Sequence, residues 1–548
     1  MVPVPQRSVL SPFQNPTFRA LWSATLFSNL GTLVQAVGAG WLMASLTPSQ
    51  DMVALVQSSN TLPVVVLSLL AGALADNFNR RRIMILAQVF VVLVSVALAL
   101  CTWAGLLTPW LLLGFTFLIG CGGALFNPSW QASMGDIVAR EDLSAAVSLN
   151  SMSFNMMRSL GPAIGGIIVA AAGAAAAFAL NAISYLPLIA ILFRWRPSYP
   201  SDPLPREPLR LALGAGLRYV ILSPVLLRVM GRGAIFGFAA ISVLALLPLV
   251  VRDLLHGTAL DYGIALGAFG LGAIGGVVLN APLRERFSNE VVVRISFIGF
   301  AVAVAALSVS NSLALSCVAL IVAGPFWVLA LSLFNVTVQL ATPRWVVGRA
   351  LSLYQTATFG GMASGAWVWG VLASHQGVSV ALATAAFVLV IGASLGAWLR
   401  LAEFSTVDLD PLGQFDAPEP QLDIRARSGP ILVLVEYEID PKDTAQFMAL
   451  MRARRRIRIR DGARQWGLLR DLENPRYWME SYHVPTWIEY LRHNARRTKN
   501  DALNYQELLT LHQGPEPTPR VRRLIERQTV PLKDDTPPRP PTTELPGV

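Results

Sequence analysis

Long apolar stretches recur through residues 1–400, and short polar or charged loops separate them. Most of the stretches contain about 20 residues, the length of helix that crosses a hydrocarbon core about 30 Å thick. Residues 402–548 instead mix apolar, polar and charged positions, as the sequence of a water-soluble protein does. The pattern therefore predicts an all-α polytopic membrane protein with a small soluble appendage.

The apolar pattern divides into twelve expected membrane spans. They cover residues 19–46, 52–75, 83–104, 108–134, 143–172, 174–193, 225–251, 258–283, 291–310, 313–340, 346–373 and 377–400. The longest connection, about residues 194–224, follows the sixth span. We therefore expect two six-helix halves, residues 1–200 and 201–401.

A repeated spacing relates the two halves. Arg140 and Arg344 are 204 residues apart, and Gly166 and Gly370 repeat the same interval. A colinear set of this kind indicates duplicated halves in parallel orientation. Transporters that bind their substrate between two halves are built in this way.

Charge is scarce and unevenly placed. The chain is 54% hydrophobic and 14% charged, whereas about 25% of the residues in ordinary soluble domains are charged. The net charge of +10 does not indicate nucleic-acid binding, because many arginines lie in loops between spans. Arg252, beside Asp253, is the exception to their gathering on one side. By the positive-inside rule both termini are cytoplasmic, and the lipid bilayer is the expected macromolecular surrounding.

An unusual charge cluster lies between the second and third spans. It consists of Gly72, Asp76, Arg80, Arg81 and Arg82. Charges this close to lipid are costly and require a reason. One interpretation is topological, in which the arginines hold the loop in the cytoplasm. The other adds ion pairs from the arginines to acids such as Asp136 or Glu141, which would close one side of a substrate cavity and break when it opens.

The spacing Gly-x-x-x-Asp-Asn-x-x-Arg-Arg-Arg resembles the signature loop of the major facilitator superfamily. The resemblance implies the superfamily's twelve-helix fold and secondary transport. Asn77 and Asn79 stand where the family pattern usually has a basic residue and a glycine. The corresponding loop of the second half, Leu279–Arg286, lacks the Asp, which weakens the case for gating ion pairs there.

A Gly-Pro-x-x-Gly-Gly run inside the fifth span consists of Gly161, Pro162, Gly165 and Gly166. Small residues let two helices approach closely, and proline bends a helix. The run is interpreted either as helix packing alone or as a hinge between inward-open and outward-open states. It resembles the fifth-span motif of exporters, and the wider text from Asn127 to Asn181 resembles the subfamily of the bacterial enterobactin exporter.

Two polar residues of the fifth span, Asn155 and Arg158, lie on nearly the same helix face. An arginine in lipid costs at least ~2.5 kcal/mol on insertion scales, so Arg158 requires a polar surrounding. Two interpretations stay open. Arg158 is a cavity charge that attracts an anionic or catechol-like substrate, or it belongs to an internal structural ion pair.

The energy source is the least defined feature, because no carboxylate lies at the middle of a span. Asp51 and Asp261, near the external ends of the second and eighth spans, are the candidates for carrying a coupling proton. The alternative is that both are loop or helix-cap acids. The chain contains no Gly-x-x-x-x-Gly-Lys-Ser/Thr phosphate loop, so ATP is not expected as the direct energy source, and no cofactor is expected.

The C-terminal part is expected to comprise a linker, a folded domain and a disordered tail, residues 402–428, 429–527 and 528–548. The expected element order strand-helix-strand-strand-helix-strand is ferredoxin-like α+β. It resembles the small dimeric domains of antibiotic-biosynthesis monooxygenases, which implies little or no cofactor and a dimer through this domain.

The charged and titratable residues of the C-terminal domain include one basic helix and three histidines. The basic helix Met451–Arg460 is expected to face an anionic leaflet or an acidic partner. His483, His493 and His512 are candidates for catalysis, although a lone histidine on such a domain more often lies at the surface or in packing.

The sequence thus predicts an exporter in the cytoplasmic membrane of a bacterium. Its cargo would be a small organic molecule such as a siderophore, an antibiotic or another secondary metabolite, moved by alternating access with a proton as coupling ion. The alternative is a membrane-tethered enzyme whose C-terminal domain modifies a metabolite. Twelve repeated spans favour transport, because a single span suffices as an anchor.

Overall fold

The computed structural model describes residues 10–139, 142–196, 209–343, 345–401, 409, 412, 415 and 417–526. The chain divides into two compact units. Unit 1 consists of Met1–Leu213, Val225–Gln339 and Arg349–Phe404. Unit 2 consists of Gly214–Pro224, Leu340–Gly348 and Ser405–Val548. The predicted disordered tail and much of the predicted linker lie outside the described residues.

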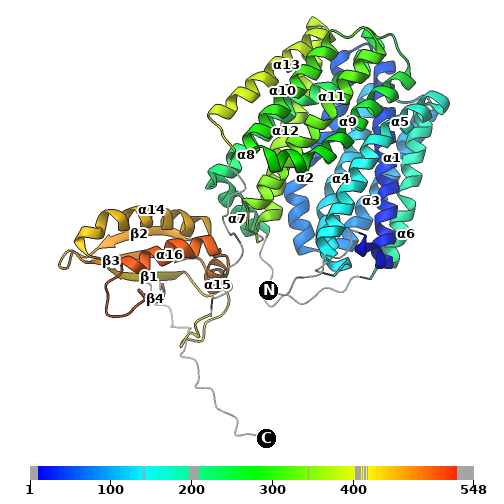
Figure 1. Cartoon of the computed structure of the whole chain (residues 1–548). Coiled ribbons are helices and arrows are strands. Elements are labelled where there is room, and N and C mark those ends of the chain that lie inside the picture. The colour runs from blue at the N-terminus through cyan, green and yellow to red at the C-terminus, as the bar shows by residue number, and fades with distance from the viewer. Residues whose placement is uncertain are drawn as a thin grey trace. The chain divides into compact units, whose positions relative to one another are not determined.

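Unit 1 is built from long helices (Figure 1). Its first half contains the short turn η1 (Ser11–Gln14) and the helices α1 (Pro16–Leu46), α2 (Gln50–Asn77), α3 (Arg80–Trp103), α4 (Pro109–Ile137), α5 (Leu143–Ser184) and α6 (Leu186–Arg194). Its second half contains α8 (Pro224–Leu249), the π-helical turn η3 (Val250–Leu254), α9 (Ala259–Arg286), α10 (Asn289–Ser308), α11 (Leu313–Leu340), α12 (Val347–Gln376), α13 (Val378–Ser394) and η4 (Leu395–Ala397). The helix α7 (Leu209–Ile221) begins in unit 1 and ends in unit 2.

The boundary that the sequence placed between the fifth and sixth spans lies inside α5. Gly173 has φ 78° and ψ 173°, which is not helical, and the helix resumes after it and runs to Ser184. A positive φ of this size is readily adopted by glycine, because glycine has no Cβ. The chain therefore changes direction at Gly173 without a separate loop.

The outward faces of the helices are apolar. In α3, Leu86, Leu93 and Leu100 recur every seven residues and are 70%, 64% and 59% exposed. Hydrocarbon solvates such a stripe, whereas water does not. Eight helical segments of the described residues are long and apolar enough to cross a membrane. The prediction of a mostly helical, polytopic membrane protein is confirmed.

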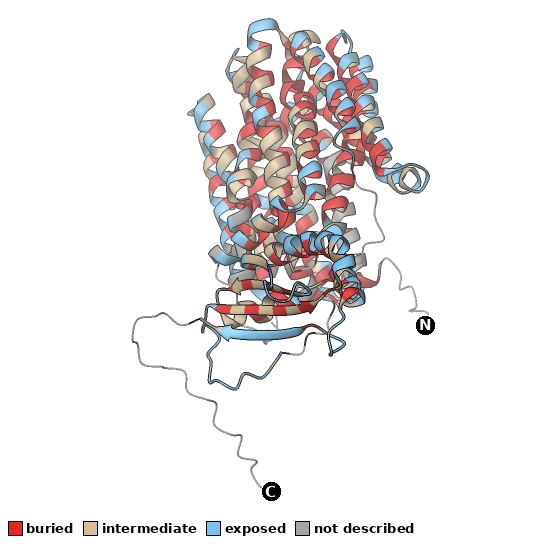
Figure 2. Cartoon of the chain, turned by 90° about the vertical axis from the view of Figure 1, so that its left-hand side faces the viewer, coloured by how far each residue is buried: buried red, intermediate tan, exposed pale blue. Residues whose placement is uncertain are grey.

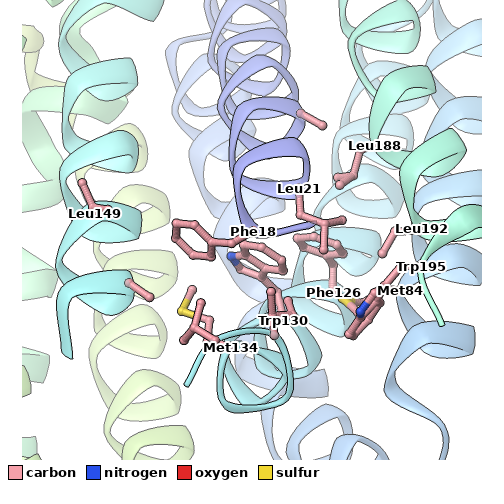
Figure 3. Close-up of a cluster of buried hydrophobic side chains, with 14 of the residues drawn as sticks. Phe18, Leu21, Met84, Phe126, Trp130, Met134, Leu149, Leu188, Leu192 and Trp195 are labelled. Carbon is pink, nitrogen blue, oxygen red and sulfur yellow. The ribbon is translucent and has the colours of Figure 1, made fainter. Parts of the chain in front are cut away.

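A cluster of buried side chains joins α1, α3, α4, α5 and α6 at the end of the first half that carries the charge cluster (Figure 3). Phe18 and Leu21 at its centre are fully buried. The Nε1 of Trp130 donates to Asn150 Oδ1 at 3.0 Å, which links α4 to α5. A tryptophan fits an apolar cluster when its N–H finds an acceptor in this way.

Unit 2 contains a four-stranded antiparallel sheet with the strand order β2-β3-β1-β4 (Figure 1). In chain order its elements are β1 (Ile431–Glu438), η5 (Pro441–Asp443), α14 (Thr444–Arg460), β2 (Arg464–Arg470), β3 (Tyr477–Val484), α15 (Trp487–Ala495), α16 (Lys499–Leu511) and β4 (Arg520–Ile525). The observed order agrees with the predicted α+β pattern, except that the second helical stretch is two helices.

One face of this sheet forms the core of the domain. Ile431, Val433 and Val435 of β1 are at most 3% exposed and pack with Phe447 and Met451 of α14. The intervening residues of β1 are half-buried, and β4 is largely exposed, as the pale blue strand in Figure 2 shows. Helices therefore cover one face of the sheet, and the other is the open face.

Two short stretches from the preceding chain also belong to unit 2. Tyr219 of α7 and Trp345, which lies between α11 and α12, meet edge to face with ring centroids 5.8 Å apart. The Arg496 guanidinium lies 4.1 Å from the Trp345 ring centroid, and that of Arg460 lies 5.4 Å from the Tyr219 ring centroid. These cation–π contacts tie the sheet domain, which consists of β1 to β4 with α14, α15 and α16, to stretches more than a hundred residues earlier in the chain.

The interior of the sheet domain contains a buried acid that accepts four hydrogen bonds. Glu480 of β3 accepts from Arg454 at 2.9 Å, from Arg458 and Trp466 at 3.0 Å, and from Tyr437 at 3.2 Å. Burial alone would raise the pKa of Glu480, but the two adjacent guanidiniums lower this pKa well below its usual range. The expectation that the basic helix faces a leaflet is therefore wrong for Arg454 and Arg458, which are 6% and 3% exposed.

Replacing Glu480 should destabilise the sheet domain. Glu480→Gln leaves two guanidiniums buried without their counter-charge, and breaking a buried pair in this way costs about 3–5 kcal/mol. Because the folded pKa is depressed, the stabilisation is present at neutral pH and is lost only as the pH falls below the normal range of a carboxyl group. Hydrogen exchange of the β1 and β3 amides in the full chain measures the loss.

The exposed Glu473, on the turn between β2 and β3, provides the matched control for this substitution. Glu473→Gln should leave the same amides as protected as they are in the unmodified chain. Equal protection in Glu480→Gln would contradict the stabilising role of the buried cluster.

Candidate functional site

Several helix pairs of the described residues join the halves of unit 1, and the first is α5 with α9. A Cβ placed on Gly263 of α9 would lie 2.5 Å from Gly166 Cα, closer than side chains tolerate. A Cβ on Gly267, one turn further along α9, would meet Ala163 at 3.1 Å. Absent or small side chains therefore let the two backbones cross in direct contact.

The same glycine run also faces α1. A Cβ on Gly161 would lie 2.7 Å from Leu33 Cβ, and one on Gly165 would lie 3.1 Å from Val34 Cα. Pro162 lies within the helix and is buried. The run thus packs α5 closely against α1 on one side and α9 on the other, the arrangement that the packing interpretation required.

The second pair is α2 with α12. Ser58 Oγ donates to the Ala363 carbonyl at 2.8 Å, and Ser68 Oγ lies 2.7 Å from Thr356 Oγ1. Near the end of α2, a Cβ on Gly72 would lie 3.3 Å from Ser352 Oγ. These polar contacts between small side chains follow α2 over much of its length.

A network around Arg252 joins the halves where α1 ends. Arg252 Nη1 donates to the carbonyls of Ala44 and Thr47, at 2.5 and 3.0 Å. Gln50 Nε2 donates to Asp253 Oδ2 at 3.3 Å. The one arginine that the charge pattern placed on the opposite side is thus part of a latch between the first and second halves.

The charge cluster between α2 and α3 lies mostly in helix. The helix α2 ends at Asn77 and α3 begins at Arg80, with the Asn79 side chain accepting from Arg82 N at 3.2 Å. Arg80 Nη1 lies 2.9 Å from Asp136 Oδ2 of α4. Asp136 is one of the two acids that the sequence offered as partners for these arginines.

Arg81 makes the second set of contacts from this cluster. Its Nε donates to the Leu192 carbonyl at 2.8 Å, and its Nη2 donates to the Phe193 carbonyl at 2.7 Å. A cation at the last carbonyls of a helix is favoured by the helix dipole. These contacts of Arg80 and Arg81 therefore brace α3 against α4 and α6 within the first half.

For three of the predicted site residues, the structure describes the helix but not the side chain. Asp76 lies near the end of α2, and Asn155 and Arg158 lie in α5. Their side chains are outside the described residues. The roles assigned to them remain predictions.

Both acids considered for proton coupling lie in the first turn of a helix. Asp51 accepts a hydrogen bond from Ser49 Oγ, the residue before α2. Asp261 forms a capping box with Thr258, accepting from Thr258 N at 2.6 Å and from its Oγ1 at 2.8 Å. These contacts are those of helix-capping acids.

Sequence reasoning missed an ion pair in the second half. Arg232 of α8 is completely buried, and its Nη1 lies 3.2 Å from Glu290 Oε1 of α10. Glu290 also pairs with Arg294 at 2.9 Å and accepts from Leu401 N at 3.0 Å. The position of Arg232 inside an apolar span was the signal that it needed an acid nearby.

Within the residues that the structure describes, no group of three or more histidine, cysteine, aspartate or glutamate side chains is arranged to hold a metal ion.

Related sequences carry the names of an enterobactin exporter and a staphyloferrin A transporter. The chain is 26% identical to the enterobactin exporter EntS of Citrobacter koseri over 387 residues, 69% of this chain and 90% of the relative. It is 27% identical to EntS of Shigella boydii over 392 residues, 70% of this chain and 91% of the relative. The staphyloferrin A transporter of Staphylococcus aureus is 25% identical over 266 residues, 48% of this chain and 66% of the relative.

Solved structures share the fold at low identity. A bacterial homologue of the human lysosomal transporter Spinster, in an inward-facing unoccupied conformation, matches with a TM-score of 0.56 at 15% identity, over 71% of this chain and 97% of that chain. A POT family transporter bound to a thioalcohol-conjugated peptide matches with a TM-score of 0.57 at 12% identity, over 70% and 96%. The transmembrane secretion effector model of the major facilitator superfamily, MFS_3, matches residues 7–529 and so includes the sheet domain. The chain therefore belongs to the transmembrane secretion effector family of major facilitator transporters.

Proposed function

We propose that this protein is a secondary active exporter that carries a small organic anion, of the siderophore class, out of the cell. The observation that carries the proposal is the pair of contacts between the halves, α5 with α9 and α2 with α12, in a chain of this family. Enterobactin and staphyloferrin A, named for the relatives, give the substrate class. Antibiotics and other secondary metabolites are the neighbouring classes.

Alternating access would use both ends of these helix pairs. The Arg252 latch joins the halves where α1 ends, and it must break when that end opens. The hinge role is assigned to Gly161, Pro162, Gly165 and Gly166. The glycines have no side chains, which would let α5 tilt against the helices packed on it. The pair Arg80–Asp136, together with Gly72, Asp76, Arg81 and Arg82, would fix the first half as a rigid body while the opposite end opens and closes.

Substrate recognition and coupling are assigned to few residues. Arg158, with Asn155 one turn before it, would attract the anionic cargo in a cavity between the halves. A proton moving inward would drive export, with Asp51 and Asp261 as its carriers. For these acids to titrate, their contacts with the adjacent Ser49 and Thr258 must rearrange during the cycle.

The topology that fits this cycle has twelve spans and two parallel halves. Residues 1–200 and 201–401 form these halves, and residues 402–428 link them to the domain at 429–527. Both termini lie in the cytoplasm of a bacterium, because the arginines gather on that side.

The sheet domain would serve assembly in this proposal. A second copy of the chain would cover the open face of the sheet at the end formed by Leu432, Leu434 and Leu524, of which Leu524 is 42% exposed. The family and the relatives are transporters, which supports transport and not catalysis for the membrane part.

Export can be tested by following the cargo in cells. A strain that lacks the gene should release less of one secreted metabolite and retain it inside, and the cloned gene should restore the release. Mass spectrometry of medium and cell extract against a panel of siderophores measures both. Unchanged release of every panel member, together with no uptake by inside-out vesicles under a proton gradient, would overturn the proposal.

A separate deletion distinguishes transport from catalysis. Removing residues 402–548 should leave the cargo chemically unchanged and reduce release only through folding or assembly. If the cargo instead appeared in an unmodified precursor form, the membrane-tethered enzyme would be the better description.

The charge cluster should affect the rate of transport. Asp136→Asn removes the partner of Arg80, and Asp76→Asn removes the acid before it. Each variant should slow release by at least about fivefold. This factor is the lower end of the coupling that is typical between two sites of an allosteric protein. Vesicle uptake measures the rate, and exchange of the two charges in Arg80→Asp with Asp136→Arg should restore part of it. Normal rates in both single variants would remove the cluster from the mechanism.

Arg158 should control affinity for an anionic cargo. Arg158→Ala should weaken binding at least about tenfold, because a hydrogen bond to a charged group contributes ~1.5–3 kcal/mol. Arg158→Lys keeps the charge and should retain part of the affinity. Equilibrium binding to the purified chain measures both, and an unchanged affinity in Arg158→Ala would assign the residue to structure.

A further inference from the structure

The sheet domain contains a pocket that no feature of the export mechanism uses. It lies where β1 and β2 end and β3 begins, and the connection between α16 and β4 forms its remaining wall. Its volume is about 530 Å³, within the range of about 300–1,000 Å³ typical of small-molecule sites. All of its lining residues belong to unit 2.

Apolar and aromatic side chains form much of the pocket wall. Leu469, Tyr477, Trp478 and Met479 line it. Tyr477 is 45% exposed and Leu469 is 54% exposed, so their apolar surfaces face solvent at the pocket. A ligand with a ring system would cover these surfaces and be held by its buried area.

The charged side chains of the pocket favour a cation. Four carboxylates line it, those of Glu436, Glu438, Asp471 and Glu516, against the two guanidiniums of Arg470 and Arg520. Glu436 lies 3.7 Å from Arg522, and Asp471 accepts from the amides of its own turn at 2.8 Å. Glu438 and Glu516 are thus the acids best suited to a bound cation.

His512 adds a neutral polar group to the same wall. Its Nδ1 accepts from Glu438 N at 3.1 Å, so the other ring nitrogen carries the proton. Burial lowers the pKa of His512 below its ordinary value although Glu438 opposes this, and the ring is therefore uncharged at neutral pH. A Cβ on Gly514 would lie 2.6 Å from His512 Nε2, so a glycine is needed to let the connection pass the ring.

A side chain already shows how a cation binds here. The Arg470 guanidinium lies 4.9 Å from the Trp478 ring centroid while its Nε donates to the Pro475 carbonyl at 2.9 Å. Aromatic faces attract cations through their quadrupole. The pocket therefore combines a cation-binding aromatic wall with an excess of carboxylates.

We propose that this pocket is a binding site for an organic cation with an aromatic body, such as a protonated ring-bearing amine. The pocket belongs to unit 2, and this proposal does not rest on the proposed export. Glu438 and Glu516 bind the positive charge, and Tyr477, Met479 and Leu469 cover the ring.

Binding of a fluorescent cation to the purified full-length chain tests the proposal. Rhodamine 6G is the probe, and fluorescein, a related ring system with negative charge, is its counterpart. Fluorescence polarisation should show saturable binding of rhodamine 6G and binding of fluorescein weaker by at least about tenfold. The double variant Glu438→Gln with Glu516→Gln should bind rhodamine 6G at least about tenfold more weakly, which corresponds to about 1.4 kcal/mol.

Glu473→Gln is the matched control, because Glu473 is a nearby exposed acid that does not line the pocket. It should bind rhodamine 6G as the unmodified chain does. The single variant Glu516→Gln, which lies on the exposed connection, keeps the test valid if the double variant fails to fold, and it should lower the affinity by at least about threefold. Equal affinity in the unmodified chain and the folded variants, or equal affinity for both dyes, would overturn the proposal.

Discussion

Pairing of charges in surroundings of low dielectric constant is the constraint on which both units depend. A lone charge in such surroundings costs several kcal/mol, so each requires a partner at hydrogen-bond distance. In unit 1, Arg232 and Glu290 meet this need between two membrane helices. In unit 2, Glu480 meets it between a strand and a helix, with two arginines. The helices and the sheet are positioned relative to their neighbours by these few contacts as well as by apolar packing.

The two halves of unit 1 satisfy the constraint differently. The first half uses Arg80 and Arg81, which bind an acid and the last carbonyls of a helix at half-exposed positions. The second half has no acid at the corresponding place in its loop, and its acid is Glu290, at the start of α10. Glu290 follows the corresponding loop, Leu279–Arg286, and pairs with Arg232 and Arg294.

Much of the fold could be predicted, because it depends on local pattern. Apolar stretches located the helices, the charge pattern offered Asp136 as one of two candidate acids for the arginine cluster, and strand-like and helix-like stretches predicted the order of the sheet domain. The partners of Arg232 and Arg454 could not be predicted. Each pairs with an acid from a distant element, 58 residues away for Arg232 and 26 for Arg454. Polarity alone cannot show that a basic helix turns two arginines inward, because the acid that draws them belongs to another element.

The crossing of α5 and α9 limits where specificity can reside. Gly166 and Gly263 meet backbone to backbone, so no side chain takes part at that point. Such a contact transmits shape and movement but cannot distinguish one cargo from another. Relatives with different cargoes could therefore share this crossing unchanged. Chemical discrimination must come from other turns of the same helices, and a change of cargo would require no change at this crossing.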